Sequence, residues 1–253
     1  MRGIVFEDLP RIPLDLDAHY DYLRRGRLAS ALYQFCFTPA VWLLRLYNFV
    51  VFGLRIEGWK NRVKLGKAGA VAVCNHVHTL DCTMVARVLW PRRQYFVTLQ
   101  SNLEMKGVRH FVRLFGGIPI PEDRCMRREL PGVLSEALSF GAVIPIYPEG
   151  ELVHYCTELR PFHKTAFTTA WRAGVPVLPM CITYRRPRGI WRFKKRPCLT
   201  LHILPAILPD KNAPRAKEVA RLQRETWQSM QACMERYAPD VPETLQKTAD
   251  LVE

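Results

Sequence analysis

His76 and Asp81 are the two residues whose types and spacing point most directly to chemistry. They lie on either side of a short polar segment that follows an apolar run, residues 71–75. Within one continuous helix, residues five apart point in different directions, so the pair can meet only if the chain bends between them. The pattern predicts such a bend: a strand that ends at residue 75, a turn, and a helix over 79–89. The Asp81 carboxylate would then fix the tautomer of the His76 imidazole, which could take a proton from a hydroxyl or a thiol.

Two further apolar runs end in segments rich in proline, glycine and charge, within residues 115–124 and 146–164. In each segment, proline or glycine at a predicted strand end leaves backbone amides free beside charged side chains. Such strand ends suit the binding of a phosphate or of a developing oxyanion. The charged and turn-forming residues of these segments are Arg124, Glu149, Gly150, Arg160 and Lys164.

The elements that must position these residues alternate along the chain from residue 54 onward. Strands are expected at residues 54–59, 94–98, 117–120, 142–147, 175–184 and 199–204, besides the one at 71–75. Helices are expected at residues 107–115, 126–140, 165–173 and 216–237, besides the one at 79–89. Alternation of this kind predicts an α/β fold with a largely parallel central sheet flanked by helices. We therefore expect one α/β domain over residues 55–253, closed by a C-terminal helix.

The preceding unit, residues 1–54, is expected to be an N-terminal helical membrane-associating motif. Residues 28–54 are almost continuously apolar and aromatic, but Pro39 and Arg45 interrupt them. A spanning helix needs about 20 apolar residues, and an arginine at mid-bilayer is costly. The pattern predicts two shorter helices that break before Pro39 and lie in one leaflet, with the basic residues 24–27 at the headgroups. An ordinary helical hairpin buried against the domain is the alternative.

Composition narrows the class of partner and the compartment. The formal net charge of +14 and the pI near 9.7 indicate an anionic partner, and 49% hydrophobic residues exclude a mainly disordered chain. The eight cysteines include no CxxC pair, which is typical of reduced thiols on the cytoplasmic side. Basic and aromatic residues interleave over residues 184–196. That segment fits a nucleic-acid surface, a lipid-interfacial loop or a solvated hairpin, and the sequence leaves all three open.

Read in order, the short motifs resemble the glycerolipid acyltransferase family, whose best known members are the lysophosphatidate acyltransferases. The resemblance extends over roughly residues 55–184. The motifs that carry it are HxxxxD at 76–81, Gly-Ile-Pro-Ile at 117–120, Pro-Glu-Gly at 148–150, Pro-Phe-His-Lys at 161–164 and Val-Pro-Val-Leu-Pro at 175–179.

The resemblance implies transfer of a fatty acyl group from acyl-CoA or an acylated carrier protein to a hydroxyl of a lysophospholipid. His76 would be the general base and Asp81 its orienting partner, with no acyl-enzyme, no metal and no cofactor beyond the thioester. Lysophosphatidate is the default acceptor, and phosphatidate the product. The residues implied to hold the glycerol phosphate or to supply positive charge are Arg124, Glu149, Gly150, Arg160 and Lys164. The expected location is the cytoplasmic face of a cell membrane, and no nucleic acid is expected as a partner.

The sequence departs from the family pattern in three places. Glu151 and Leu152 stand where members usually have Thr-Arg, Arg124 comes two residues late, and His78 occupies a place where a serine is common. Glu151 would repel a phosphate unless another cation intervenes. Another lysolipid acceptor, or a catalytically altered lipid-binding protein, therefore remains an alternative.

Other classes of site fit less well. His76, His78 and Asp81 have the wrong order and spacing for a metallo-hydrolase, since Cys82 stands where the last histidine would be. The Gly-x-Ser-x-Gly turn of a serine hydrolase is absent from the sequence. A nucleic-acid-binding module would explain the charge but not the apolar region at 28–54.

Overall fold

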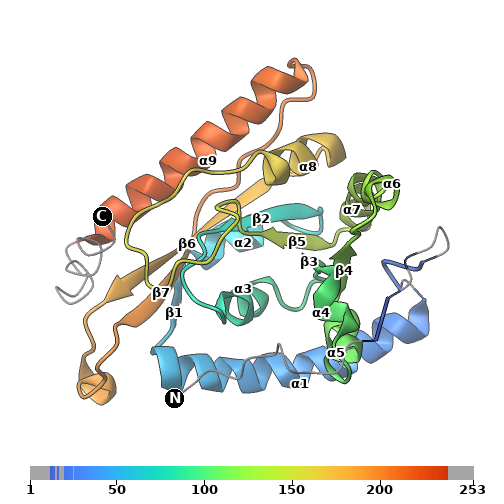
Figure 1. The fold of residues 1–253 in the computed structure, drawn as a ribbon. Coiled ribbons are helices and arrows are strands. Elements are labelled where there is room, and N and C mark those ends of the chain that lie inside the picture. Colours follow the sequence, from blue (N-terminus) through green and yellow to red (C-terminus); the bar gives the residue numbers. More distant parts are fainter. Residues whose placement is uncertain (1–11, 15, 17–19, 25, 239–253) are drawn as a thin grey trace.

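The centre of the protein is a five-stranded sheet with strand order β1-β7-β6-β2-β5 (Figure 1). The computed structural model describes residues 12–238 except 15, 17–19 and 25. The central strands are β1 (Arg55–Glu57), β2 (Ala70–Cys74), β5 (Val143–Ile146), β6 (Val177–Arg185) and β7 (Cys198–Ile203). A smaller sheet pairs β3 (Phe96–Leu99) with β4 (Gly117–Ile120). All neighbouring strands run parallel except β6 and β7, which form an antiparallel hairpin. The predicted α/β class with a largely parallel sheet is confirmed.

Strand β2 shows why the central strands read as continuous apolar runs. All five of its residues are buried. Val71 and Val73 belong to one core cluster, whereas Ala70, Ala72 and Cys74 belong to another on the opposite face. A sheet covered on both faces must be apolar on both, so its strands lose the polar alternation of a half-exposed sheet.

Helices cover both faces of the sheet (Figure 1). The first core cluster is closed by α7 (Leu130–Ser139), α8 (Thr165–Ala173) and α9 (Arg215–Tyr237). The second is closed by α3 (Asp81–Leu89) and by the end of α1 (Arg27–Phe52). The shorter helices are α2 (Trp59–Lys64), α4 (Gln100–Glu104), α5 (Val108–Leu114), α6 (Arg124–Arg127) and the 3₁₀ turn η2 (Gly189–Trp191). The single helix expected at 126–140 is instead split into α6 and α7, since Pro131 fits only the first turn of a new helix.

The predicted two-helix N-terminal motif is wrong. Helix α1 runs unbroken for 26 residues and carries Pro39 in its interior. Proline costs one backbone hydrogen bond, but apolar side chains on both sides of it hold the helix against the domain. Tyr33, Phe37 and Val41 form a buried cluster with side chains of α3 and of Phe115. The helix ends at Gly53, whose φ of 55° is the left-handed conformation that closes many helices.

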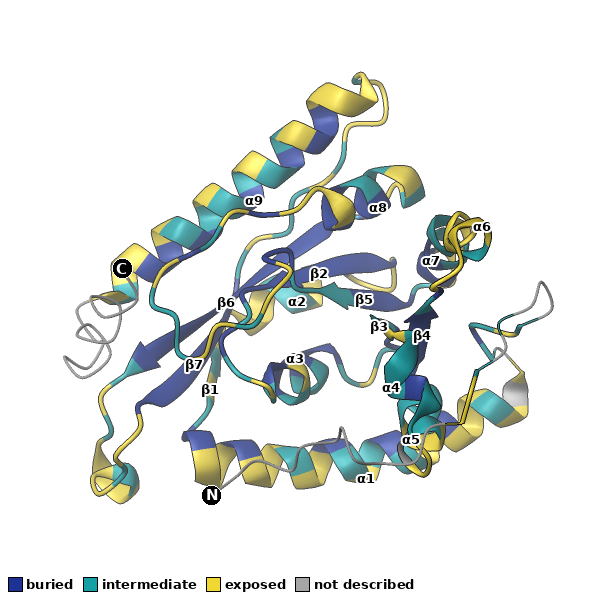
Figure 2. Cartoon of the chain, viewed as in Figure 1, coloured by how far each residue is buried: buried dark blue, intermediate teal, exposed yellow. Residues whose placement is uncertain are grey.

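Helix α1 is exposed along the side that faces away from the domain (Figure 2). The segment Leu28–Phe52 is long and apolar enough to cross a membrane, and 22% of its most apolar window is buried. The alternative expectation, a helical hairpin buried against the domain, is also wrong, since α1 is one helix and most of this window is not buried. Of the basic residues 24–27, Arg25 lies outside the described residues, as do residues 1–11 of the expected N-terminal unit.

Candidate active site

Asn75 marks the point at which strand β2 leaves the sheet. Its side chain is fully buried, donates from Nδ2 to the carbonyl of Ile182 at 3.0 Å and accepts from the Ile182 amide at 2.8 Å. These two bonds tie the end of β2 to the middle of β6. The residue that follows, His76, is thereby held at the carboxyl edge of a parallel sheet, where open α/β folds place their sites.

The predicted meeting of His76 and Asp81 is confirmed. The imidazole Nδ1 lies 3.0 Å from Asp81 Oδ2. The same oxygen accepts from the backbone amides of Val77 at 2.8 Å and His78 at 2.9 Å. Asp81 sits in the first turn of α3, where a carboxylate is favoured, and its side chain is fully buried. One carboxylate oxygen thus shapes the bend and fixes the imidazole at once.

The His76 ring is held from a second side by Tyr147. The two rings are stacked, with centroids 4.3 Å apart and planes 22° from parallel. The His76 side chain keeps 23% of its surface exposed, so a substrate can reach it. With Nδ1 directed at Asp81, a neutral imidazole carries its proton on Nδ1 and offers the lone pair of Nε2 as a base.

Glu149 joins the Pro-Glu-Gly turn to the histidine. Its Oε2 accepts from the His76 backbone amide at 3.2 Å and from Arg160 Nη2 at 2.6 Å. The Glu149 side chain is 2% exposed, so the Arg160 guanidinium compensates a buried negative charge. Arg160 also donates to the backbone carbonyl of Glu151. The two predicted site residues therefore form a pair next to the imidazole, and part of the Arg160 charge is already engaged.

Gly150 is required by the shape of this turn. Its φ is 80°, and a Cβ added there would lie 2.9 Å from the His163 ring. Both observations exclude a larger residue. The His163 amide donates to the Pro148 carbonyl at 2.7 Å, which closes the segment from the other side.

Arg124 and Lys164 are not part of this hydrogen-bonded group. Arg124 is exposed in the first turn of α6, which Asp123 caps by accepting from the amides of Cys125 and Met126. Lys164 is exposed at the N-terminal end of α8. No hydrogen bond or ion pair joins either side chain to His76, Asp81 or Glu149 within the part of the chain that the structure describes.

His78 links the bend to helix α1 and to the segment after the Pro-Glu-Gly turn. Its ring packs edge-on against Phe52 at 4.8 Å and against Tyr155 at 5.8 Å. Its Nδ1 accepts from the Leu80 amide at 3.1 Å, and burial is the main cause that lowers its pKa. The Tyr155 amide donates to the Val77 carbonyl at 2.9 Å. A neutral, packed ring at position 78 is thus a structural part of the bend.

Sequence reasoning missed the roles of Asn75, Tyr147 and His78. Asn75 precedes the histidine, and Tyr147 precedes Pro148, so both lie inside motifs that were already marked. The local sequence did not predict their partners. Asn75 binds a carbonyl and an amide of β6, and Tyr147 stacks on the His76 ring. Within the described residues, no group of three His, Cys, Asp or Glu side chains is placed to hold a metal ion.

Comparison with known proteins gives two findings. The family model described as Acyltransferase matches residues 54–183, just over half of the 253 residues. Among solved structures, the chain is similar to the 1-acyl-sn-glycerophosphate (LPA) acyltransferase PlsC from Thermotoga maritima, with a TM-score of 0.55 and 19% identity. That match covers 86% of this chain and 98% of the other, and at this identity it shows a shared fold. No curated protein sequence matches the chain.

Proposed function

The chain belongs to the acyltransferase family, and from this premise we propose that it moves a fatty acyl group from a thioester to a lysophospholipid hydroxyl. The donor in this proposal is acyl-CoA or an acylated carrier protein. The acceptor is lysophosphatidate, which would become phosphatidate. The observation that carries the proposal is the 3.0 Å contact between His76 Nδ1 and the buried Asp81 carboxylate, beside an imidazole that stays open to substrate.

In the proposed reaction, His76 Nε2 takes the proton of the acceptor hydroxyl while the hydroxyl oxygen attacks the carbonyl carbon of the thioester. A C–O bond forms, and the tetrahedral intermediate then expels the thiolate as the C–S bond breaks. The imidazolium returns its proton to the leaving sulfur, so no proton is gained or lost overall. Asp81 stabilises the imidazolium and keeps Nε2 aimed at the substrate. The chemistry requires neither an acyl-enzyme nor a metal.

We assign the phosphate of the acceptor to the Pro-Glu-Gly side of the site. Gly150 lets the backbone approach a ligand closely, and Arg160 supplies a guanidinium held in place by Glu149. Since Glu149 and the Glu151 carbonyl already engage Arg160, Lys164 or Arg124 is proposed to add charge when the substrate binds. Glu149 is a positioning residue in this scheme, because it contacts His76 and Arg160 but carries the wrong charge for a phosphate.

The proposed site of action is a membrane surface that α1 contacts from the cytoplasmic side. Its outward side exposes large apolar side chains, among them Leu28 at 83%, Phe35 at 78% and Leu43 at 69%. The inward side is packed on the domain from Tyr33 to Phe52. A helix attached to a globular domain along its length cannot cross the bilayer, so we propose that it lies in the plane of one leaflet.

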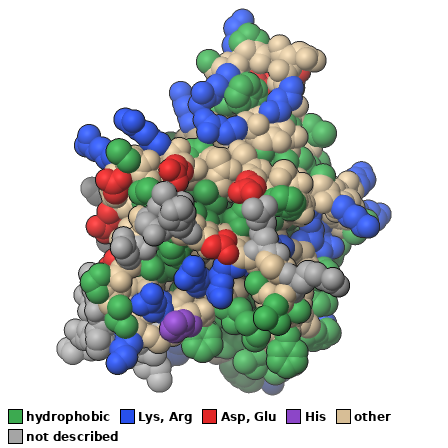
Figure 3. Space-filling model, turned by 90° about the vertical axis from the view of Figure 1, so that its right-hand side faces the viewer, with side chains coloured by type: hydrophobic (Ala, Val, Ile, Leu, Met, Phe, Trp, Pro, Cys, Tyr) green, Lys and Arg blue, Asp and Glu red, His purple; other side chains and the backbone are tan. Residues whose placement is uncertain are grey.

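The β6–β7 hairpin extends the same surface. Trp191 Nε1 donates to the carbonyls of Phe49 and Val50 at 3.2 and 3.3 Å, and its ring packs edge-on against Phe49. Ile190 and Phe193 beside it are 75% and 82% exposed. Figure 3 shows the opposite end of the molecule from the hairpin, where Lys and Arg side chains are spread over the face and hydrophobic side chains gather near its lower edge, the height of α1 in Figure 1. Of the three interpretations of this hairpin, its contact with α1 supports the lipid-interfacial loop.

The test is release of thiol from an acyl thioester in the presence of a panel of lysolipids. We expect release that depends on the acceptor, is greatest with lysophosphatidate, and falls by about 10²–10⁴-fold in His76→Ala. The exposed His110 offers a matched control, and His110→Ala should keep the wild-type rate.

Each other outcome corrects a different part of the proposal. Release that persists in His76→Ala removes this imidazole from the mechanism. Release with another lysolipid but not with lysophosphatidate corrects the acceptor. Lipid binding without release under any condition identifies a catalytically altered lipid-binding protein.

A further inference from the structure

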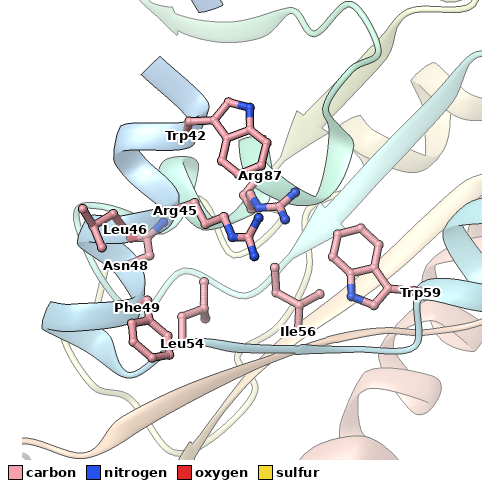
Figure 4. A pocket seen from close by; sticks show the side chains of 9 residues that line it. All are labelled: Trp42, Arg45, Leu46, Asn48, Phe49, Leu54, Ile56, Trp59 and Arg87. Atoms are coloured by element: carbon pink, nitrogen blue, oxygen red, sulfur yellow. The ribbon is translucent and has the colours of Figure 1, made fainter. Parts of the chain in front are cut away.

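A cavity lies beside the C-terminal half of α1, between that helix, β1 and the helices α2 and α3 (Figure 4). Its volume is about 520 Å³. None of the residues assigned above to acyl transfer lines it, and none of its nine lining residues is acidic. The cavity is therefore a separate feature of the molecule with an excess of positive charge.

Two arginines supply that charge. The Arg45 guanidinium lies 5.0 Å from the Trp42 ring centre, and that of Arg87 lies 5.6 Å from the Trp59 ring centre. Figure 4 shows both guanidinium groups reaching into the cavity, and the charge of Arg45 is close enough to lower the pKa of Arg87. Both positive charges face the same space, so an anion placed between them would be attracted by both. The pKa of Arg87 is lowered mainly by burial, and further by the positive charges of Arg45 and Arg62.

Nothing else in the described residues neutralises the two arginines. Neither forms an ion pair with a described carboxylate. Arg62, the next cation, is engaged with backbone carbonyls, since it donates to Val88 at 2.8 Å and to Trp90 at 2.6 Å. Glu57, which follows the lining residue Ile56, is paired with His202 on another side of the sheet.

Asn48 is the one uncharged polar residue in the wall of the cavity. The residue is 1% exposed, and its Oδ1 accepts from Thr83 Oγ1 at 3.1 Å. Its Nδ2 is buried and has no acceptor among the described residues. Thr83 Oγ1 also lies 2.7 Å from the Leu80 carbonyl, so the Asn48 side chain belongs to the contact between α1 and α3, and the charge of the cavity comes from the two arginines.

The remaining wall is apolar and continues onto the membrane-facing side of α1. Trp42, Leu46 and Phe49 line the cavity, and they are also 55%, 60% and 46% exposed on the helix. A ligand that satisfies both parts must carry an anion at one end and hydrocarbon at the other.

We propose that this cavity binds the phosphate group of an anionic phospholipid, with the two guanidinium groups on its oxygens and the lipid chains along α1. Arginine pairs are well suited to phosphate because each presents a planar fork of donors. The proposal rests in part on the membrane contact proposed for α1, but it does not depend on acyl transfer. The site would fix the position of the protein on the lipid surface.

The test is direct binding of dihexanoyl phosphatidylglycerol, used as monomers in solution, measured by calorimetry. We expect Arg45→Gln and Arg87→Gln each to weaken binding about tenfold, since each removes a charged hydrogen-bond donor. Arg172→Gln on α8 is the matched control and should bind as the wild type does, and Arg160→Gln reports whether the lipid occupies the catalytic site instead. Circular dichroism checks that each variant folds, and Arg87→Lys, which keeps the charge but loses the fork, should bind with intermediate affinity.

Three results would overturn the proposal. Loss of binding in Arg160→Gln but not in Arg87→Gln would place the lipid in the catalytic site. An equal loss in Arg172→Gln would show diffuse attraction to net charge. Inorganic phosphate that binds as tightly as the lipid would show that the apolar wall takes no part.

Discussion

At the scale of single residues, Asp81 has the most concentrated set of contacts in the site. Its Oδ2 serves the His76 ring and two backbone amides, whereas its Oδ1 is buried without a partner among the described residues. Three donors on one oxygen require an acceptor with full negative charge, because an amide oxygen accepts more weakly. The residue therefore combines two tasks, the shape of the bend and the orientation of the imidazole.

Asp81→Asn keeps the shape of the side chain and removes its charge. It therefore tests the orientation of the imidazole without unfolding the bend. We expect Asp81→Asn to lower kcat by about 10²–10⁴-fold with a much smaller change in KM, because the imidazole loses its tautomer and the stabilisation of its charged form. Steady-state kinetics with acyl-CoA measure both values. Asp123→Asn is the control, since Asp123 also accepts from two backbone amides but caps the remote helix α6. A kcat within tenfold of the wild type would contradict the orienting role.

The pair Glu149–Arg160 makes a different prediction, about stability. Arg160→Ala leaves a buried carboxylate without its cation, and we expect a loss of about 3 kcal/mol in the free energy of unfolding, the low end for buried pairs because Arg160 is 21% exposed. Adding Glu149→Gln should recover much of that loss, since it removes the unpaired charge. A double-mutant cycle by urea denaturation measures the coupling, and additive single effects would show that the pair does not stabilise the site.

At the scale of elements, the local sequence pattern predicted the strands that are buried on both faces and the helices that are apolar along one side. Strands β2, β6 and β7 read as apolar runs because helices cover both sides of the sheet. Helix α8 was predicted with its bounds, and Gly174 ends it with a φ of 69°. The short helices α2 and α4 were not predicted, and two further errors fell where a proline had two possible effects. Pro39 lies inside α1, whereas Pro131 begins α7, and only tertiary packing decides between these outcomes.

The site was predictable to the extent that its contacts are local. His76 and Asp81 are five residues apart, so spacing and the predicted bend were enough to join them. The bond from Asn75 to Ile182 spans 107 residues, and the one from His76 to Glu149 spans 73. Contacts of that range depend on strand order, which the sequence pattern does not specify.

Replacing Pro39 tests whether α1 is a single helix. Since α1 passes through it unbroken, Pro39→Ala should restore one backbone hydrogen bond and stabilise the protein by up to about 3 kcal/mol. Thermal unfolding measures the change, and binding to lipid vesicles should be retained. Had the motif required two helices, the same substitution would weaken binding by straightening the break. A variant that is less stable or that no longer binds vesicles would therefore contradict the single-helix structure.

At the scale of the whole molecule, the candidate site and the proposed membrane face are physically joined. Phe52, the last residue of α1, packs against His78 in the catalytic bend, and Asn48 of the same helix contacts Thr83 of α3. The bend that holds His76 thus rests directly on the helix that we place in the lipid.

The other side of the sheet is held by His202, which connects four elements. Its Nδ1 lies 3.3 Å from Glu57 of β1, its Nε2 lies 2.8 Å from Thr183 Oγ1 of β6, and its ring stacks on Tyr237 of α9. Burial lowers its pKa below the ordinary 6.5, against the attraction of Glu57, and the charge of Arg236 lowers it further. The folded protein therefore holds this ring neutral, as it does His78.

The sign of the resulting pH dependence follows from proton linkage. Below about pH 6.5 the unfolded chain binds a proton at each of these two positions more readily than the folded chain does, so the stability that they contribute is present above that pH and is lost as the pH falls. The slope for one histidine is at most about 1.4 kcal/mol per pH unit. Glu218, whose pKa is lowered mainly by its bond to Arg221, adds its own loss only below about pH 4.5. The range from about pH 7 to pH 5 thus isolates the histidines.

We therefore expect the free energy of unfolding to fall between about pH 7 and pH 5, and to fall less steeply in His202→Gln than in the wild type. Urea denaturation at fixed ionic strength measures both slopes, and an unchanged m-value would show that the unfolded state is the same at each pH. The variant itself should be less stable at pH 7, because it loses the contacts that tie β1, β6 and α9 together. Exposed His110 provides the control, since His110→Gln should leave the wild-type slope intact. If His202→Gln also kept that slope, the acid sensitivity of the fold would have to reside in His78 and the catalytic bend, and an acid-induced loss of activity would then precede global unfolding.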